Sequence, residues 1–193
     1  MLKIEENQRV AIFIDVQNMF YSAKHQHDSK LDFEKLLKLI SRKRVVVRAI
    51  AYAVETEEID QSNFFDFLTR MGIEVKKKPL RLRADGSSKG DWDMGLAIDA
   101  LMISEKVDTI ILVSGDGDFL HLINALKYKG TRAEVASFTN SSTKDLIAAA
   151  DCHFPLDKDI LIENKVKSNN KISKKPLKKT VKSNKLNKTK KGQ

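Results

Sequence analysis

Residues 108–120 read DTIILVSGDGDFL, and the rest of the chain is organised around this stretch. Thr109–Val113 contains only apolar or β-branched residues, which is typical of a strand buried on both faces. The segment SGDGD (114–118) then breaks the strand pattern, and apolar residues resume at helical spacing. Because ligands of open α/β sheets bind beyond the carboxyl ends of the strands, we expect any bound cation to be held by Asp116 and Asp118.

Strand and helix patterns alternate along most of the chain. We expect strands at residues 10–15, 45–54, 73–78, 109–113 and 133–138, and a short extended piece at 152–156. We expect helices at residues 18–27, 33–40, 59–72, 94–106, 119–130 and 141–150, and a polar loop at 83–89. Strands that alternate with helices predict an α/β fold, with a parallel sheet covered by helices on both faces.

The charge of the chain is concentrated at one end. The whole chain of 193 residues has a net charge of +9, whereas residues 161–193 carry twelve Lys and one Glu, which leaves −2 for residues 1–160. We therefore expect one globular domain at 1–160 and a disordered Lys-rich tail at 161–193, which has too few large apolar residues to join a core.

Three features concern the compartment of the protein. Cys152 is the single cysteine, so no internal disulfide is expected, which fits a reducing environment. Residues 1–10 are polar and charged, unlike a signal peptide. No run of about 18 apolar residues is present, so no membrane span is expected. These features predict a soluble cytoplasmic protein.

Acidic residues recur at the predicted strand ends and helix starts. Asp15 ends the first strand, Asp116 and Asp118 follow the fourth, and Asp93 lies at the start of the helix between them. In doubly wound sheets the first and fourth strands are often neighbours, which would bring these acids to one edge. Carboxylates alone suit Mg²⁺ or Mn²⁺, and no His/Cys set has zinc spacing. Such a site serves metal-assisted phosphoryl transfer.

A structural role is the alternative for each acid taken alone, because Asp also caps helices and forms turns. Asp91 is most simply a helix cap. Asp99 lies about 120° around the helix from Asp93, so a solvated position and a functional one are equally compatible with its spacing. The coincidence of acids at three strand ends favours the functional interpretation.

Three motifs in this order resemble an NYN domain, more narrowly its LabA/DUF88 branch, which is related to PIN-domain nucleases. They are DVQN (15–18), KGDWD (89–93) ahead of LAIDA (96–100), and SGDGDF (114–119). The resemblance extends over about residues 8–155. It implies a Rossmann-like PIN fold, a three-layer sandwich with a mostly parallel sheet of five to six strands in the order 3-2-1-4-5.

The resemblance also implies a metal-dependent ribonuclease site. Asp15, Asp93, Asp116 and Asp118 match the metal-ligating acids of the family, and Asn18 matches its asparagine. Asp99 matches an acid of the helix and is an additional candidate ligand, while Lys89 matches a basic residue that would contact phosphate. The KGDWD motif has one residue more than the form common in the family, which leaves the choice between Asp91 and Asp93 open.

The tail is typical of a nucleic-acid arm. Its lysines, among them Lys174, Lys175, Lys178 and Lys179, are spread among Ser, Asn and Thr with no aromatic residue, so they offer attraction to RNA phosphates without base stacking. A solubilising tail is the alternative.

We therefore predict a Mg²⁺- or Mn²⁺-dependent endoribonuclease. A catalytically silent RNA-binding or regulatory protein of the same fold is the first alternative. A phosphatase or nucleotidase is the second, because Rossmann-like acidic sites serve those reactions too. PIN-like domains often pair, so a homodimer is also an open alternative.

Overall fold

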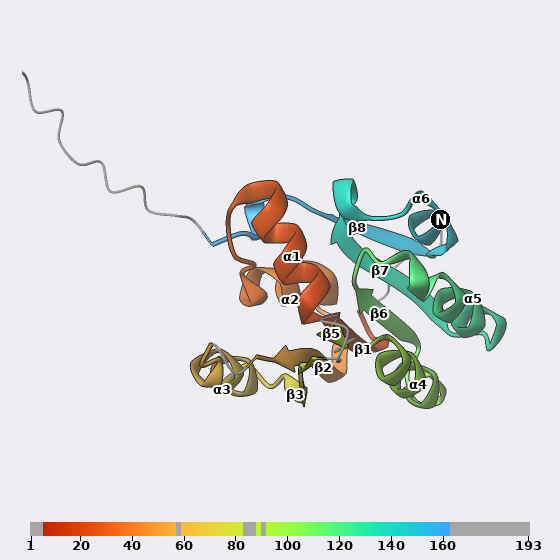
Figure 1. Cartoon of the computed structure of the whole chain (residues 1–193). Helices are drawn as coiled ribbons and strands as arrows, with labels where there is room; N and C mark the ends of the chain where they lie inside the picture. Colours follow the sequence, from red (N-terminus) through yellow and green to blue (C-terminus); the bar gives the residue numbers. More distant parts are fainter. Residues whose placement is uncertain (1–5, 57–58, 83–87, 90–91, 163–193) are drawn as a thin grey trace, which may run out of the picture.

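The centre of the molecule is a six-stranded sheet in which all neighbouring strands run parallel (Figure 1). The computed structural model describes residues 6–56, 59–82, 88–89 and 92–162. The strands of the sheet are β1 (Arg9–Asp15), β2 (Val45–Glu55), β3 (Glu74–Pro79), β6 (Thr109–Val113), β7 (Arg132–Phe138) and β8 (Cys152–Leu156). Their order is β3-β2-β1-β6-β7-β8. The expected α/β fold is confirmed, and β8 extends the expected order 3-2-1-4-5 by a sixth strand at the edge.

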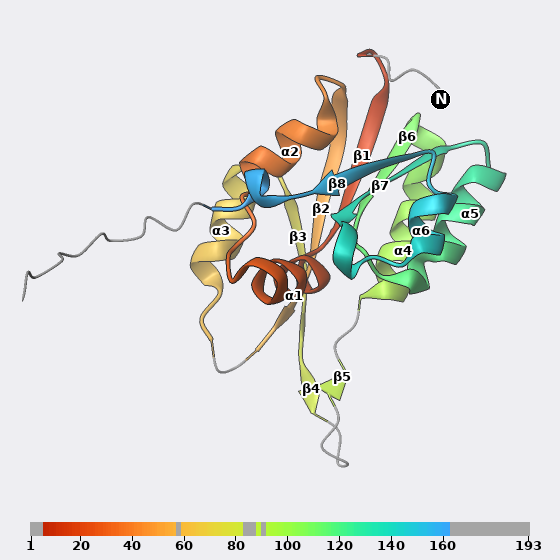
Figure 2. The ribbon, with the colours of Figure 1, turned by 90° about the horizontal axis from the view of Figure 1, so that it is seen from above.

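Within the described residues, six α-helices cover the two faces of this sheet (Figure 2). One face carries α1 (Val16–His27), α2 (Phe33–Ser41) and α3 (Ser62–Arg70). The other carries α4 (Asp93–Ile103), α5 (Leu120–Tyr128) and α6 (Lys144–Ala149). Single 3-10 turns adjoin these elements at Ser104–Lys106, Gly117–Phe119, Thr139–Ser141 and Lys158–Ile160. The arrangement is the expected three-layer sandwich.

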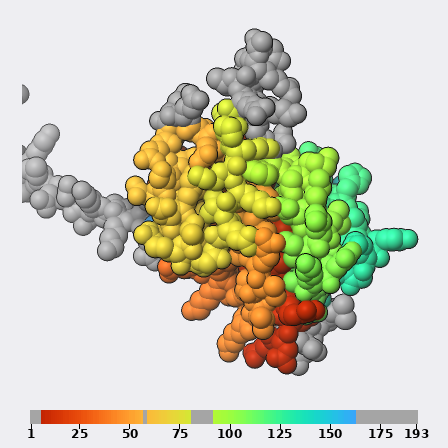
Figure 3. Space-filling model, turned by 90° about the horizontal axis from the view of Figure 1, so that it is seen from below, coloured from red at the N-terminus to blue at the C-terminus, as the bar shows by residue number. Residues whose placement is uncertain are grey.

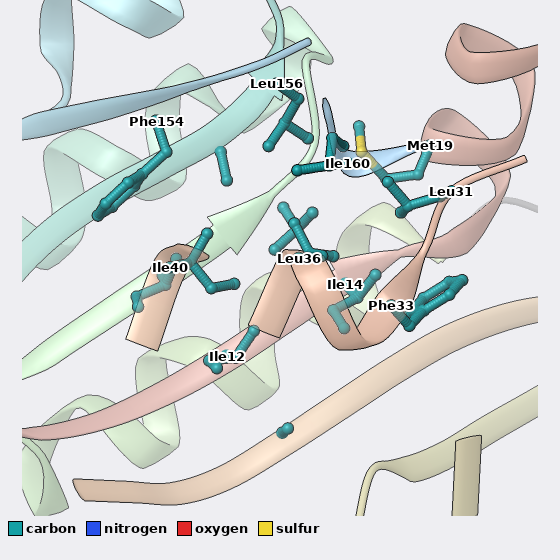
Figure 4. Close-up of a cluster of buried hydrophobic side chains, with 14 of the residues drawn as sticks. Ile12, Ile14, Met19, Leu31, Phe33, Leu36, Ile40, Phe154, Leu156 and Ile160 are labelled. Atoms are coloured by element: carbon teal, nitrogen blue, oxygen red, sulfur yellow. The ribbon is translucent and has the colours of Figure 1, made fainter. Parts of the chain in front are cut away.

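Alternate residues of β1 point into two separate cores, as the two-residue period of a strand requires. Ile12 and Ile14 pack with the apolar sides of α1 and α2 (Figure 4). Phe13 packs on the other face, where α4 and α5 lie. Every residue of β6 is buried, as the apolar run at Thr109–Val113 predicts. On the second face, β2 and β3 reach the surface beside α4 (Figure 3).

Some expected boundaries differ from the structure. The prediction of a polar loop at 83–89 is wrong for its last two residues, because they form β5 (Ser88–Lys89). This strand pairs antiparallel with β4 (Arg81–Leu82). Strands pair through their backbone groups, and the polar residues of this short strand show no alternation of apolar and polar side chains from which it could be predicted. Residues 83–87 lie outside the described residues, as does the tail from 163 to 193.

A buried ion pair connects the α2 side to the sheet. Arg44 Nη2 donates to Glu134 Oε2 at 2.8 Å and to the carbonyl oxygen of Ile40 at 2.7 Å, while Arg132 Nε donates to Glu134 Oε1 at 2.6 Å. The side chains of Arg44 and Glu134 are both fully buried. Removal of Glu134 would therefore leave the buried charge of Arg44 without compensation.

We expect Glu134→Ala to lower the free energy of unfolding by about 3–5 kcal/mol, because Arg44 would stay buried without its counter-charge. Urea denaturation measures this change. Glu105→Ala is the matched control, because Glu105 forms an exposed pair with Lys129 and its loss should cost less than about 1 kcal/mol. Equal losses of stability in the two variants would contradict the role given to the buried pair.

Candidate metal centre

The site begins where two central strands end together. Ile14 pairs with Val113 in the sheet, so the next residues lie side by side: Asp15 is the last residue of β1, and Ser114 directly follows β6. Asp15 Oδ1 accepts a hydrogen bond from the backbone N–H of Asn18 at 3.0 Å and thereby caps α1. Asp15 Oδ2 accepts a hydrogen bond from Ser114 Oγ at 3.1 Å. The carboxylate of Asp15 is thus held by the first turn of α1 and by the residue that follows β6.

The loop after β6 is fixed by three hydrogen bonds. The N–H of Asp116 donates to Ser114 Oγ at 3.2 Å, and the N–H of Gly115 donates to Asn18 Oδ1 at 3.0 Å. The N–H of Asp118 donates to Asp116 Oδ1 at 3.0 Å, which starts the following 3-10 turn. The side chain of Asn18 therefore positions the loop that carries Asp116 and Asp118.

Two glycines allow this loop to pack closely against the segment before α6. A Cβ on Gly115 would lie 2.6 Å from Ser142 Oγ, and one on Gly117 would lie 2.8 Å from Thr143 Cγ2. The N–H of Thr143 also donates to the carbonyl oxygen of Gly115 at 3.3 Å. Larger residues at either glycine would push the acid-bearing loop away from this support.

The structure brings three of the expected acids into one group. Asp93 at the start of α4, Asp116 and Asp118 each offer a carboxylate oxygen, and these oxygens all lie within 4.8 Å of one another. A hollow of about 250 Å³ beside them is lined by Asp15, Gln17, Asn18, Tyr21, Tyr52, Trp92, Asp93 and Asp116. Carboxylates this close repel one another, and a hard divalent cation relieves that repulsion. The donor set therefore fits Mg²⁺ or Mn²⁺.

The pKa of Asp15 differs from that of a carboxyl group on the protein surface. Burial raises its pKa above the ordinary value for Asp. The hydrogen bonds from Asn18 and Ser114 favour the ionised form and lower the pKa in part, while the negative charge of Asp116 raises it further. The folded protein therefore holds a proton on Asp15 up to a higher pH than the unfolded chain does.

Asp99 lies outside this acid group and has partners of its own. Its Oδ2 accepts hydrogen bonds from Tyr52 Oη at 2.6 Å and from Lys76 Nζ at 2.5 Å. Burial alone would raise the pKa of Asp99, but the bonds to Lys76 and Tyr52 outweigh it and lower the pKa. The structure thus places Asp99 in a network between α4, β2 and β3.

Tyr52 and Ser114 are site residues that the sequence patterns did not single out. Tyr52 is the direct β2 partner of Asp15 in the sheet, and burial together with the bond to Asp99 raises the pKa of its hydroxyl. Its ring stands edge-on to Trp92, whose Nε1 donates to the carbonyl oxygen of Ala53 at 2.8 Å. These two rings form a wall of the acid hollow.

The remaining expected residues lie elsewhere. Lys89 belongs to β5, whereas Asp91 and the tail lysines Lys174, Lys175, Lys178 and Lys179 lie outside the described residues. Of the helices that the structure describes, none combines the length and the hydrophobicity needed to cross a bilayer.

We expect Asp15→Asn to raise the melting temperature in EDTA at pH 8. The folded state binds the proton on Asp15 more tightly than the unfolded state does. The free energy of unfolding of the parent therefore falls as the pH rises from about 4 to above the raised pKa of Asp15. Asparagine can still accept from the N–H of Asn18 and does not ionise, so the gain should fade near pH 4.

Thermal denaturation followed by circular dichroism at both pH values measures this difference. The control is Asp145→Asn on α6, whose side chain is exposed and does not line the hollow. The explanation fails if Asp15→Asn changes stability equally at both pH values.

Comparisons with known proteins agree with this geometry. Residues 9–157 match the family model described as NYN domain. The chain is 32% identical over 157 residues, 77% of its length and 84% of the relative, to the low amplitude and bright protein LabA of Synechococcus elongatus. It is 25% identical over 171 residues, 84% of its length and 64% of the relative, to an uncharacterized protein of Methanocaldococcus jannaschii.

The fold also matches a solved structure. A protein of unknown function from Vibrio parahaemolyticus superposes with a TM-score of 0.76 at 34% identity, over 83% of this chain and 100% of that one. The chain belongs to the NYN domain family, and LabA is one of its relatives.

Proposed function

We propose that this protein is an endoribonuclease that hydrolyses RNA phosphodiester bonds at a Mg²⁺ or Mn²⁺ site. The observation that supports this most directly is the group of three carboxylates at the carboxyl edge of a parallel sheet, with oxygens within 4.8 Å of one another. Membership of the NYN domain family, which is related to PIN-domain nucleases, supports RNA as the substrate.

The residues have distinct roles in this proposal. Asp93, Asp116 and Asp118 hold the cation, and Asp15, which lines the same hollow, completes the donor set. When bound there, a divalent cation neutralises charge on the scissile phosphate and activates the attacking water. Asn18 keeps Asp116 and Asp118 in place through its bond to the N–H of Gly115.

RNA affinity must come from residues outside the acid hollow, because carboxylates repel phosphates. We propose that Lys89 and the tail lysines, including Lys174, Lys175, Lys178 and Lys179, attract the RNA backbone. In this proposal residues 1–160 form the catalytic domain and residues 161–193 a Lys-rich arm that binds RNA. The free, buried Cys152 is consistent with action in the cytoplasm.

We expect the purified protein to cut a mixed RNA pool in Mn²⁺ or Mg²⁺ and to leave it intact in EDTA. Asp116→Asn should slow cleavage by at least about a hundredfold, because a charged ligand of the cation is lost while the fold is kept. The same variant should lose the stabilisation that the metal confers, about 2.7 kcal/mol at a hundred times the dissociation constant. Gel analysis of the RNA and thermal denaturation with and without metal measure both effects.

Asp145→Asn is the matched control and should cut RNA like the parent. Two outcomes would contradict the proposed nuclease function, and each would favour a different function. If RNA is bound but stays intact in every metal, the chain is a catalytically silent RNA-binding protein. If nucleotides are hydrolysed and RNA is not, it is a phosphatase or nucleotidase.

We expect truncation after Ile162 to weaken RNA binding and to flatten its salt dependence, because twelve lysines are removed. The slope of log K against log salt should become shallower by about 0.7 for each RNA phosphate that the tail lysines neutralise in the parent. Cleavage at saturating RNA should persist. The cut is placed after Ile162 because Leu161 is buried and bridges to Leu31. An unchanged salt slope would indicate a tail that serves solubility alone.

A further inference from the structure

A second and larger hollow adjoins the acid site. It has a volume of about 670 Å³ and is lined by residues of α1, of α3 and of the carboxyl end of β2. This volume is within the range of about 300–1,000 Å³ found for small-molecule sites. Five of the residues that line it are Phe or Tyr, namely Phe20, Tyr21, Phe33, Phe64 and Phe67. We call this hollow the aromatic groove.

The aromatic groove and the acid hollow are neighbours on the surface of α1. Gln17 and Tyr21 line both of them. Gln17, Phe20, Tyr21 and Lys24 are spaced i, i+3, i+4 and i+7 on α1, so they form one stripe that leads away from Asp15 at the start of the helix. A chain that enters the acid hollow can therefore extend along this stripe.

The aromatic rings of the stripe are accessible. Phe20 is 59% exposed and Tyr21 is 62% exposed, although large aromatic side chains usually lie mainly buried. The ring of Tyr21 lies 4.0 Å from the ring of His25, measured between centroids, which limits its freedom to move. An exposed, oriented ring beside a phosphodiester site offers a flat surface for a nucleobase.

The positive charge near the aromatic groove comes mainly from the segment that follows it in the sequence. Lys24 and Lys30 line the groove together with one acid, Asp60, and Lys24 also pairs with Asp28. Ile162, the last described residue, also lines it, and the next residues of the sequence, 163–193, carry twelve Lys and one Glu. The Lys-rich segment is thus attached at the groove, where its charge is complementary to a polyanion. Stacking surfaces combined with such charge are the features that bind single-stranded nucleic acid.

We infer that the aromatic groove is a base-binding subsite for single-stranded RNA, in which a nucleotide next to the scissile phosphate stacks on Tyr21 and Phe20. The inference rests on the proposed nuclease function and specifies its substrate. Stacking accepts any base, so cleavage is tolerant of sequence. It requires an unpaired base, so duplex RNA is excluded from the site.

The test uses a ten-nucleotide single-stranded RNA with one 2-aminopurine, placed in turn at each position. The protein carries Asp116→Asn, so that the RNA stays intact. We expect the fluorescence to be quenched at one or two adjacent positions, and Tyr21→Ala to weaken binding about tenfold and to abolish the quenching. Tyr21→Phe should keep both, because the ring remains. Tyr128→Ala is the matched control, since Tyr128 is 94% exposed on α5 and lines neither hollow.

Three outcomes would overturn the inference. The first is equal affinity and quenching in Tyr21→Ala and the parent. The second is an equal rate of cleavage for single-stranded and duplex RNA. The third is a dimer that becomes a monomer in Tyr21→Ala, which would assign the aromatic groove to a second copy of the chain.

The two proposals fail separately. If the parent cuts RNA in Mn²⁺ and Tyr21→Ala leaves KM and quenching unchanged, the nuclease stands and the subsite falls. If no metal supports cleavage but quenching still depends on Tyr21, the subsite stands and the catalytic role falls.

Discussion

The hydrogen bond between the Ser114 hydroxyl and Asp15 is the contact on which the candidate site depends. It joins the carboxyl ends of β1 and β6, where the chain turns to opposite faces of the sheet. The same hydroxyl accepts from the N–H of Asp116, and Asn18 accepts from the N–H of Gly115. Because these bonds are part-buried, competition from water is reduced, and the acids keep their places despite mutual repulsion.

The arrangement of the acids at the site lowers the stability of the folded protein when no cation is bound. Burial of Asp15 and the approach of Asp93 to Asp116 and Asp118 each cost free energy in the absence of a cation. The two cores on either face of the sheet supply the stability that holds this arrangement. Such local conflict with stability is common where side chains are arranged for function.

The acidic and the basic residues lie in separate parts of the chain, and each part suits a different ligand. The acid hollow can hold a cation but repels a phosphate backbone. In our proposals, the Lys-rich segment supplies attraction over distance, and the aromatic groove supplies stacking at close range. Tyr21 stands between the two hollows and lines both, so it is the residue through which bound RNA would be aligned with the acids.

The sequence by itself determined the fold class and most of the strands. A continuous apolar run such as Thr109–Val113 is buried on both faces, and local pattern suffices to predict it. The acids at strand ends were also visible, because Asp15, Asp93 and Asp116 each follow or begin a clear element. Only the tertiary structure showed that Asp99 turns to Lys76, that Tyr52 faces the site and that α1 and α3 enclose an aromatic groove. These features depend on strand register and helix packing, which join residues far apart in the chain and leave no local pattern.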